Sequence, residues 1–139
     1  MNNRIVEQMR WIEQAKYDFD TARDLYEKQR YNWCCYLCQQ ASEKAVKAVY
    51  INRGEYVEKV HSIFVLIEGD KTYRINGIEE LKNCSEQARR LDRYYIPTRY
   101  PNGVPYGVAY RYFGLKDAKN CMDDCETIIL CVKKLLQIT

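Results

Sequence analysis

Basic and aromatic side chains are concentrated in residues 89–112. This stretch holds one acid, Asp92, six of the thirteen tyrosines, all three prolines and five arginines: Arg89, Arg90, Arg93, Arg99 and Arg111. Arginine binds phosphate through paired hydrogen bonds, and tyrosine stacks on nucleobases. Arg99, which lies between two prolines, is therefore a candidate for binding an anionic ligand. The alternative is that Arg99 pairs with an acid on a helix and that the tyrosines fill one end of the fold.

His61 is the only histidine in the chain. This excludes any metal site that needs two histidines and leaves few schemes for acid–base catalysis. His61 opens the short apolar run 61–67, where a lone histidine more often caps a helix or bonds to the backbone than acts as a base. Both roles stay open at this point.

Two lysines occur at helical spacing beside a stripe of small residues. Gln40, Lys44 and Lys47 follow one another at steps of four and three, so they share one helix face. The neighbouring stripe, Ala41, Ala45 and Ala48, predicts close contact with other helices. Lysines at such a margin are placed to meet a phosphate or a partner's carboxylates, although a polar stripe is more often only a solvated face.

The seven cysteines favour a role in the core. The N-terminus reads as a charged amphipathic segment and not as a secretory signal, so a disulfide framework is not expected. The pairs Cys35/Cys38 and Cys121/Cys125 could together supply four zinc ligands. Both pairs lie in strongly helical sequence, which favours small apolar core residues over a metal site. We predict no metal and no cofactor.

Length and composition predict one globular domain, 1–139. The chain is 47% hydrophobic and 29% charged, with six glycines and three prolines, which excludes disordered and collagen-like classes. The net charge is +3, which by itself says little about partners. No apolar run approaches the ~18 residues of a membrane span. We therefore expect a cytoplasmic protein that does not enter a membrane.

Helical periodicity runs through nearly the whole sequence. Steps of three and four predict long helices over 3–28, 31–53, 78–91 and 114–137, and a short helix over 61–67, where a strand competes. In the first helix the predicted buried stripe begins with Ile5 and Met9. Asn32 is the expected N-cap of the second helix, and Gly54 its stop. The prolines make 95–110 an irregular loop. The prediction is an all-α, up-and-down bundle of four long helices and one short one.

Four motifs together resemble the HEPN domain family of prokaryotic proteins. Tyr17-Asp-Phe-Asp-Thr-Ala22 resembles the family's first helix, and Cys38-Gln-Gln-Ala-Ser-Glu-Lys-Ala-Val-Lys-Ala48 its "QQAxEKAxKA" signature. His61-Ser-Ile63 resembles "HSL", and Tyr95-Ile-Pro-Thr-Arg-Tyr-Pro101 resembles the segment ending in "RYP". The resemblance covers nearly the whole chain. It implies an up-and-down helical bundle that forms homodimers.

For activity, the resemblance has two branches. Many HEPN proteins are metal-independent endoribonucleases with an Arg-x4-6-His motif. This motif is absent here: neither Arg53 before His61 nor the residues after Arg99 provide the spacing. We therefore expect no catalytic residues. A ribonuclease toxin with a divergent site that uses His61 remains an alternative, as does a module that only dimerises or docks a partner.

The second branch resembles this chain better. Small HEPN proteins with the Arg-Tyr-Pro motif are commonly encoded beside a minimal nucleotidyltransferase, with which they form a two-component, toxin–antitoxin-like system. The resemblance implies that such a protein binds a nucleotide, ATP or GTP, or RNA. Transferred to this sequence, the implied nucleotide-binding residues are Lys44, Lys47, His61, Tyr95, Arg99 and Tyr100.

Overall fold

The computed structural model describes residues 3–139, which form helices, turns and loops and one isolated bridge between Asp70 and Ile75. The longest helices are α1 (Asn3–Glu27), α2 (Tyr31–Asn52) and α6 (Leu115–Leu135). Between α2 and α6 lie α3 (Ile63–Glu68), the 3-10 helix η1 (Glu79–Cys84), α4 (Ser85–Asp92) and α5 (Ala109–Tyr112). The predicted all-α bundle is confirmed, because η1 runs directly into α4 and the two together form the fourth long helix.

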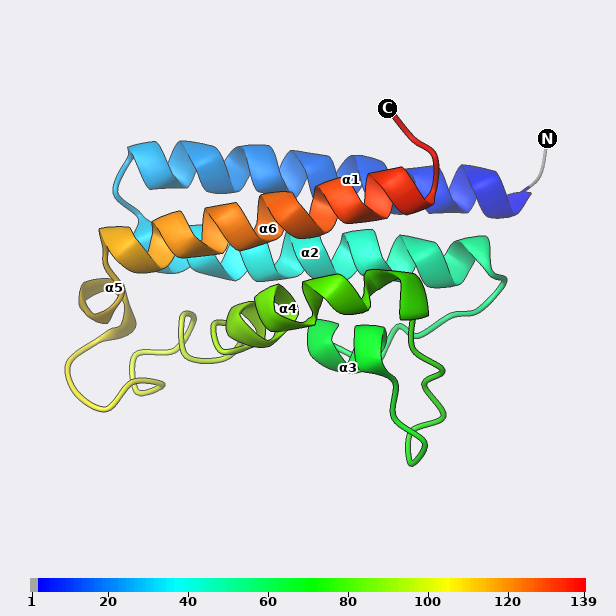
Figure 1. Ribbon diagram of the computed structural model, residues 1–139. Coiled ribbons are helices and arrows are strands. Elements are labelled where there is room, and N and C mark those ends of the chain that lie inside the picture. Colours follow the sequence, from blue (N-terminus) through cyan, green and yellow to red (C-terminus); the bar gives the residue numbers. More distant parts are fainter. Residues whose placement is uncertain (1–2) are drawn as a thin grey trace.

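Helix α2 lies at the centre of the bundle and contacts α1, α3, α4, α5 and α6. Figure 1 shows α1 and α2 as an antiparallel hairpin, with α6 beside α2 and with α3 and α4 on the other side of α2 from α1. The small residues Ala41, Ala45 and Ala48 are completely buried. They allow the neighbouring helices to approach α2 closely, as the sequence predicted.

Three local predictions are corrected by the structure. The buried stripe of α1 begins only at Gln8, because Ile5 and Met9 are 41% and 36% exposed. Asn32 is not the N-cap, since α2 already begins at Tyr31 and the Asn32 side chain turns inward. The irregular loop ends at residue 108, because 109–112 form the single turn of α5.

The N-terminus of α3 is capped twice, and this explains why 61–67 is not a strand. The Ser62 hydroxyl accepts the amide of Val65 at 3.1 Å. The Asp92 carboxylate, at the end of α4, accepts the amides of Ile63 and Phe64 at 2.9 and 3.0 Å and the Ser62 hydroxyl at 2.7 Å. A carboxylate at this position also interacts favourably with the positive end of the helix dipole. The cap therefore fixes a helix of only six residues.

Six of the seven cysteines are buried, mostly where α2 faces α6. Hydrogen bonding to Cys125 and to Cys34 and burial raise the pKa of Cys38. Burial and a hydrogen bond to Cys131 raise the pKa of Cys84 to about 12. Among residues 3–139, no group of three or more His, Cys, Asp and Glu side chains is arranged to hold a metal ion. The thiols therefore act as small apolar side chains in the core.

None of the helices formed by residues 3–139 combines the length and the apolar character that a bilayer span requires.

Replacing Asp92 with Ala should destabilise the protein by about 2–3 kcal/mol, because two helical amides and a hydroxyl lose their acceptor. Urea unfolding measures this loss. Asp123→Ala is the matched control, since its carboxylate is 71% exposed and should change the free energy of unfolding by less than about 0.5 kcal/mol. Equal stability of the two variants would contradict the capping role.

The folded protein should react slowly with an aromatic disulfide reagent at pH 8. The thiolate is the nucleophile, and a thiol such as Cys84 with a pKa of about 12 stays protonated at that pH. Cys131, the one cysteine that is only half-buried, should account for the fast phase. Rapid reaction of several thiols per folded molecule would disprove the packing of α2 against α6, and unfolding in guanidinium should expose all seven.

Candidate functional site

Arg99 is held by three tyrosine rings. Its guanidinium carbon lies 4.6 Å from the centre of the Tyr95 ring, 4.9 Å from Tyr36 and 5.2 Å from Tyr100. Its Nε–H donates to the carbonyl oxygen of Tyr95 at 2.9 Å. Cation–π contacts of this kind fix a guanidinium without neutralising its charge. We call these four residues the Arg99 clamp; Tyr36 comes from α2, and the other three come from the loop after α4.

The charge of Arg99 is not balanced by an acid. In the part of the chain that the structure describes, every ion pair uses another cation. The Nη groups of Arg99, which carry four of the five guanidinium donors, have no acceptor among residues 3–139. The alternative in which Arg99 pairs with an acid on a helix is therefore wrong. Arg99 is half-buried, and its fork of Nη donors has no partner among the described residues.

His61 lies beside the clamp through the same tyrosine. Its ring stacks on Tyr95 with 5.4 Å between the centroids and 18° between the planes. Its Nδ1 lies 3.3 Å from Oε2 of Glu43, and the side chain is 47% exposed. A carboxylate at Nδ1 orients an imidazole, and the other nitrogen, Nε2, has no hydrogen-bond partner among the described residues. The fold thus brings the single histidine and Arg99 into contact with the same tyrosine, Tyr95, although 38 positions separate them in the sequence.

The loop that carries Arg99 is anchored at Thr98. This threonine is completely buried, and its carbonyl oxygen accepts the side-chain amide of Asn32 at 3.0 Å. Its hydroxyl donates to the carbonyl oxygen of Tyr94 at 2.5 Å. The Tyr94 hydroxyl in turn donates to Asp117 at 3.0 Å, and burial raises the pKa of Tyr94, so the phenol stays protonated. These bonds explain why Asn32 points inward, and they tie the proline-rich loop to α2 and α6.

His61 is anchored by the buried amide of Gln39. The Gln39 Nε2 donates to the carbonyl oxygen of His61 at 2.9 Å and lies 3.4 Å from the Asp92 carboxylate. Asp92 caps the helix that begins two residues after His61. Tyr95 follows Asp92 by three residues. The Asp92 carboxylate therefore fixes both the segment just after His61 and the segment just before Tyr95, whose rings stack on each other.

The two lysines from the sequence prediction are both in ion pairs. Lys47 is 4% exposed, and its Nζ donates to Glu43 at 2.9 Å and to the carbonyl oxygen of Glu58 at 3.0 Å. Lys44 pairs with Asp18 of α1 at 2.6 Å and lines a cavity on the α1 side of α2. Lys47 therefore reaches the site only indirectly, through the Glu43 carboxylate that it shares with His61. The structure gives Lys44 no contact with the Arg99 clamp.

Tyr36 and Glu43 were not among the predicted site residues. Both lie on α2, at steps of four and three from Gln40, so the spacing that singled out the lysines would also have found them. Tyr36 stacks on Tyr95 with 6.4 Å between the centroids. Of the predicted residues, His61, Tyr95, Arg99 and Tyr100 come together.

A second group of aromatic rings lies further along the same loop. Tyr106 and Tyr112 meet edge to face at 5.3 Å, and Tyr112 meets Phe113 at 5.2 Å. Tyr106 and Tyr110 are 74% and 61% exposed. The alternative that the tyrosines fill one end of the fold fits Tyr94, which packs against the core and lies 5.6 Å from the Phe113 ring, but not these exposed rings.

Comparison with known proteins identifies the family. The HEPN domain model matches residues 8–135. The chain therefore belongs to the HEPN domain family, as its motifs indicated. It is 28% identical over 133 residues to the protein named "Putative toxin MJ1304" of Methanocaldococcus jannaschii, covering 91% of this chain and 86% of that protein. It is also 26% identical over 137 residues to human sacsin, of which the match spans 3%.

Solved structures show the same fold. TT1696 from Thermus thermophilus has a TM-score of 0.78 and 31% identity, with 91% of this chain and 96% of that chain covered. ST0689, an archaeal HEPN homologue, has a TM-score of 0.73 and 30% identity, with 92% and 96% covered. An HEPN domain protein from Thermotoga maritima has a TM-score of 0.65 and 30% identity, with 92% and 98% covered.

Replacing Lys47 with Met should destabilise the protein by about 3 kcal/mol, because it leaves the Glu43 carboxylate buried without its counter-ion. The control is Lys44→Met, which removes a more exposed partner of Asp18 and should cost about 1 kcal/mol. Urea unfolding of both variants measures the difference. A Lys47 variant as stable as the wild type would show that this lysine is not a structural support and would return it to the ligand-binding set.

Proposed function

We propose that this protein is a non-enzymatic nucleotide-binding HEPN protein. The Arg99 clamp and His61 hold the phosphates of ATP, GTP or an RNA end, and Tyr100, which is 48% exposed, offers its ring to the base. Lys44 and Lys47 are left out of the ligand-contacting set because both are already in ion pairs. Lys47 acts by holding Glu43, which orients His61.

One observation carries this proposal: a guanidinium fixed by aromatic rings, without an acid, beside an exposed imidazole. A guanidinium fork matches the oxygen atoms of a phosphate and forms two parallel hydrogen bonds with them. Because the clamp and the Tyr95 carbonyl already restrict the side chain, little conformational entropy remains to be lost on binding. A preformed site of this kind favours a small anion over a large surface.

The proposed setting is a single-domain cytoplasmic homodimer that works with a minimal nucleotidyltransferase in a toxin–antitoxin-like system. The resemblance in the motifs supports the nucleotidyltransferase, and the name of the Methanocaldococcus relative supports a toxin-like role. Exposed apolar residues at the start of α1, Ile5, Val6 and Met9, provide a surface for a partner or a second copy.

Replacing Arg99 with Ala should abolish saturable ATP and GTP binding measured by calorimetry. Loss of two charge-assisted hydrogen bonds corresponds to roughly a hundredfold weaker binding or more. The free energy of unfolding should fall by only about 1 kcal/mol, since the tyrosines lose cation–π contacts and no buried acid is left unpaired.

Arg99→Lys is the matched control, because it keeps the charge and loses the planar fork. It should bind the nucleotides with intermediate affinity. If Arg99→Ala binds ATP as the wild type does, the clamp is not the site. If it unfolds instead, Arg99 is a structural strut and the proposal fails.

A second function, a metal-independent ribonuclease, is favoured by the contact between His61 and Glu43. A carboxylate-oriented imidazole is the arrangement of a general base, and Arg99 lies on the same tyrosine. This function predicts RNA cleavage in the presence of a chelator, with loss of activity of at least about a hundredfold in His61→Ala. Intact RNA after long incubation with concentrated wild-type protein would exclude it.

A further inference from the structure

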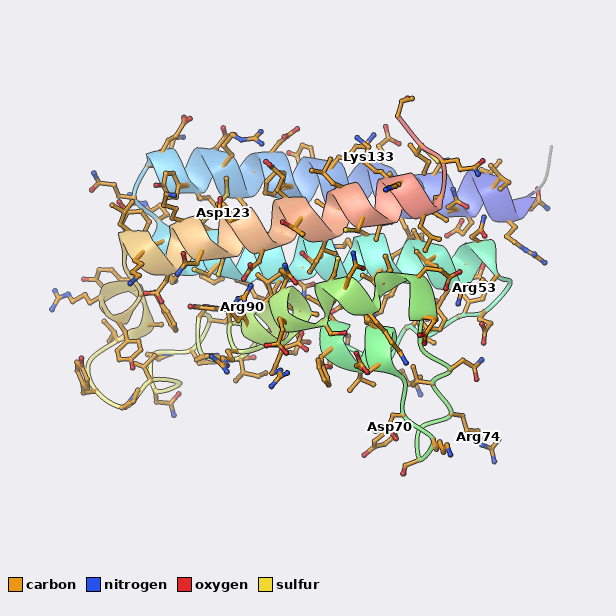
Figure 2. All side chains as sticks on the ribbon, in the orientation of Figure 1. Arg53, Asp70, Arg74, Arg90, Asp123 and Lys133 are labelled. Carbon is orange, nitrogen blue, oxygen red and sulfur yellow. The ribbon has the colours of Figure 1, made fainter. Side chains whose placement is uncertain are left out.

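An open groove of about 460 Å³ lies between the loop of residues 55–60 and the turn of residues 70–75. It is separate from the Arg99 clamp, and we call it the Tyr56–Tyr73 groove after the two rings that line it. Figure 2 shows that the turn, marked by Asp70 and Arg74, projects away from the helices of the bundle. The groove therefore lies on a part of the chain that a ligand can approach from solvent.

The two tyrosines of the groove are among the most exposed large side chains of the protein. Tyr56 is 64% exposed and Tyr73 is 72% exposed. Among residues 3–139, neither hydroxyl forms a hydrogen bond and neither ring packs on another aromatic ring. Their aromatic faces are therefore free for a ligand. Aromatic rings of this kind stack on unpaired bases of any sequence.

The turn that carries Tyr73 is well defined. The Asp70 carboxylate accepts the amides of Thr72 and Tyr73 at 2.9 and 3.3 Å, and the backbones of Asp70 and Ile75 pair at 2.8 and 2.9 Å. Gly69 has a φ of 87°, and a Cβ there would meet the Ile75 carbonyl oxygen at 2.9 Å. The ring of Tyr73 is thus presented by a turn with its own hydrogen bonds.

The side chains that line the groove carry one more positive charge than negative, although its two segments also contain Glu55 and Asp70 outside the lining. Lys59 and Arg74 line it and form no ion pair in the described part of the chain, and Glu58 is the only acid of the lining. The groove is connected to the Arg99 site through the chain, because its loop ends at Val60, the residue before His61. The carbonyl oxygen of Glu58 accepts Lys47, which shares Glu43 with His61. Tyr56 and His61 are five residues apart, so their Cα atoms lie at most about 18 Å from each other, a separation that a short strand can bridge.

We propose that the Tyr56–Tyr73 groove is a second binding site, for the bases of a single-stranded nucleic acid whose end occupies the Arg99 site. One or two unpaired bases stack on Tyr56 and Tyr73, while Lys59 and Arg74 face the adjoining phosphates. This inference rests on the proposed function of the Arg99 site and extends its ligand from a mononucleotide to a strand. Stacking and phosphate pairing are shared by RNA and DNA, so the experiment includes both.

The test measures the affinity of fluorescent single-stranded RNA and DNA of about ten nucleotides by anisotropy, beside ATP by calorimetry. The double variant Tyr56→Ala/Tyr73→Ala should bind the strand about tenfold more weakly or worse, since each stacked base contributes roughly 1–3 kcal/mol. ATP binding should be unchanged. Tyr56→Phe/Tyr73→Phe, which keeps both rings, should bind the strand as the wild type does. Lys59→Ala should reduce the slope of the logarithm of strand affinity against the logarithm of salt concentration by about 0.7.

Controls separate this inference from the proposed function. Tyr17→Ala removes a ring that is 67% exposed on α1 and should change neither affinity. If the wild type binds the strand but not ATP, and the double alanine variant loses the strand, the groove is confirmed and the mononucleotide function is wrong. Three results would each overturn the inference. The double alanine variant could bind the strand as tightly as the wild type does, it could lose ATP affinity as much as strand affinity, or the wild type could bind a duplex as tightly as the strand. Whichever of RNA and DNA binds more tightly identifies the source of the strand.

Discussion

The Asp92 carboxylate is the constraint on which the site depends. It ends α4 and at the same time caps α3 through the amides of Ile63 and Phe64. His61 precedes this cap by two residues, and Tyr95 follows Asp92 by three, so their rings are brought to a stacking distance of 5.4 Å. A carboxylate that satisfies helical amides is held in one geometry. The positions of the imidazole and of the clamp therefore follow from one hydrogen-bonded cap.

A buried ion pair on α2 supports the position of His61. Glu43 and Lys47 form an ion pair with side chains that are only 6% and 4% exposed, and Glu43 also contacts His61. A buried pair contributes little net stability, but removal of one partner leaves an uncompensated charge. The pair is thus better understood as a device that fixes the imidazole than as a source of stability. Arg99, in contrast, is surrounded by aromatic rings in place of an acid, so no carboxylate of the described residues neutralises its charge.

Much of the fold followed from local sequence, because helical periodicity, Gly54 and the prolines act over short distances. The candidate site followed only in part. Residue types and proline spacing identified Arg99, Tyr95 and Tyr100, and these do come together with His61. The burial of Lys47 could not be predicted from the sequence. It depends on the path of the loop of residues 55–60, which places the Glu58 carbonyl oxygen within hydrogen-bond distance of the lysine. Such long-range contacts leave no periodic signal in the sequence.

The proposed function requires that Arg99 and His61, which both contact Tyr95, bind the same ligand. Nuclear magnetic resonance of the Arg99 guanidinium and His61 imidazole during titration with ATP tests it most directly. If both bind the nucleotide, the signals of both side chains should shift together and saturate at the same nucleotide concentration, while that of the buried Lys47 ammonium should not change. Shifts confined to Lys44 and the α1 side of α2, with Arg99 and His61 unaffected, would contradict the account.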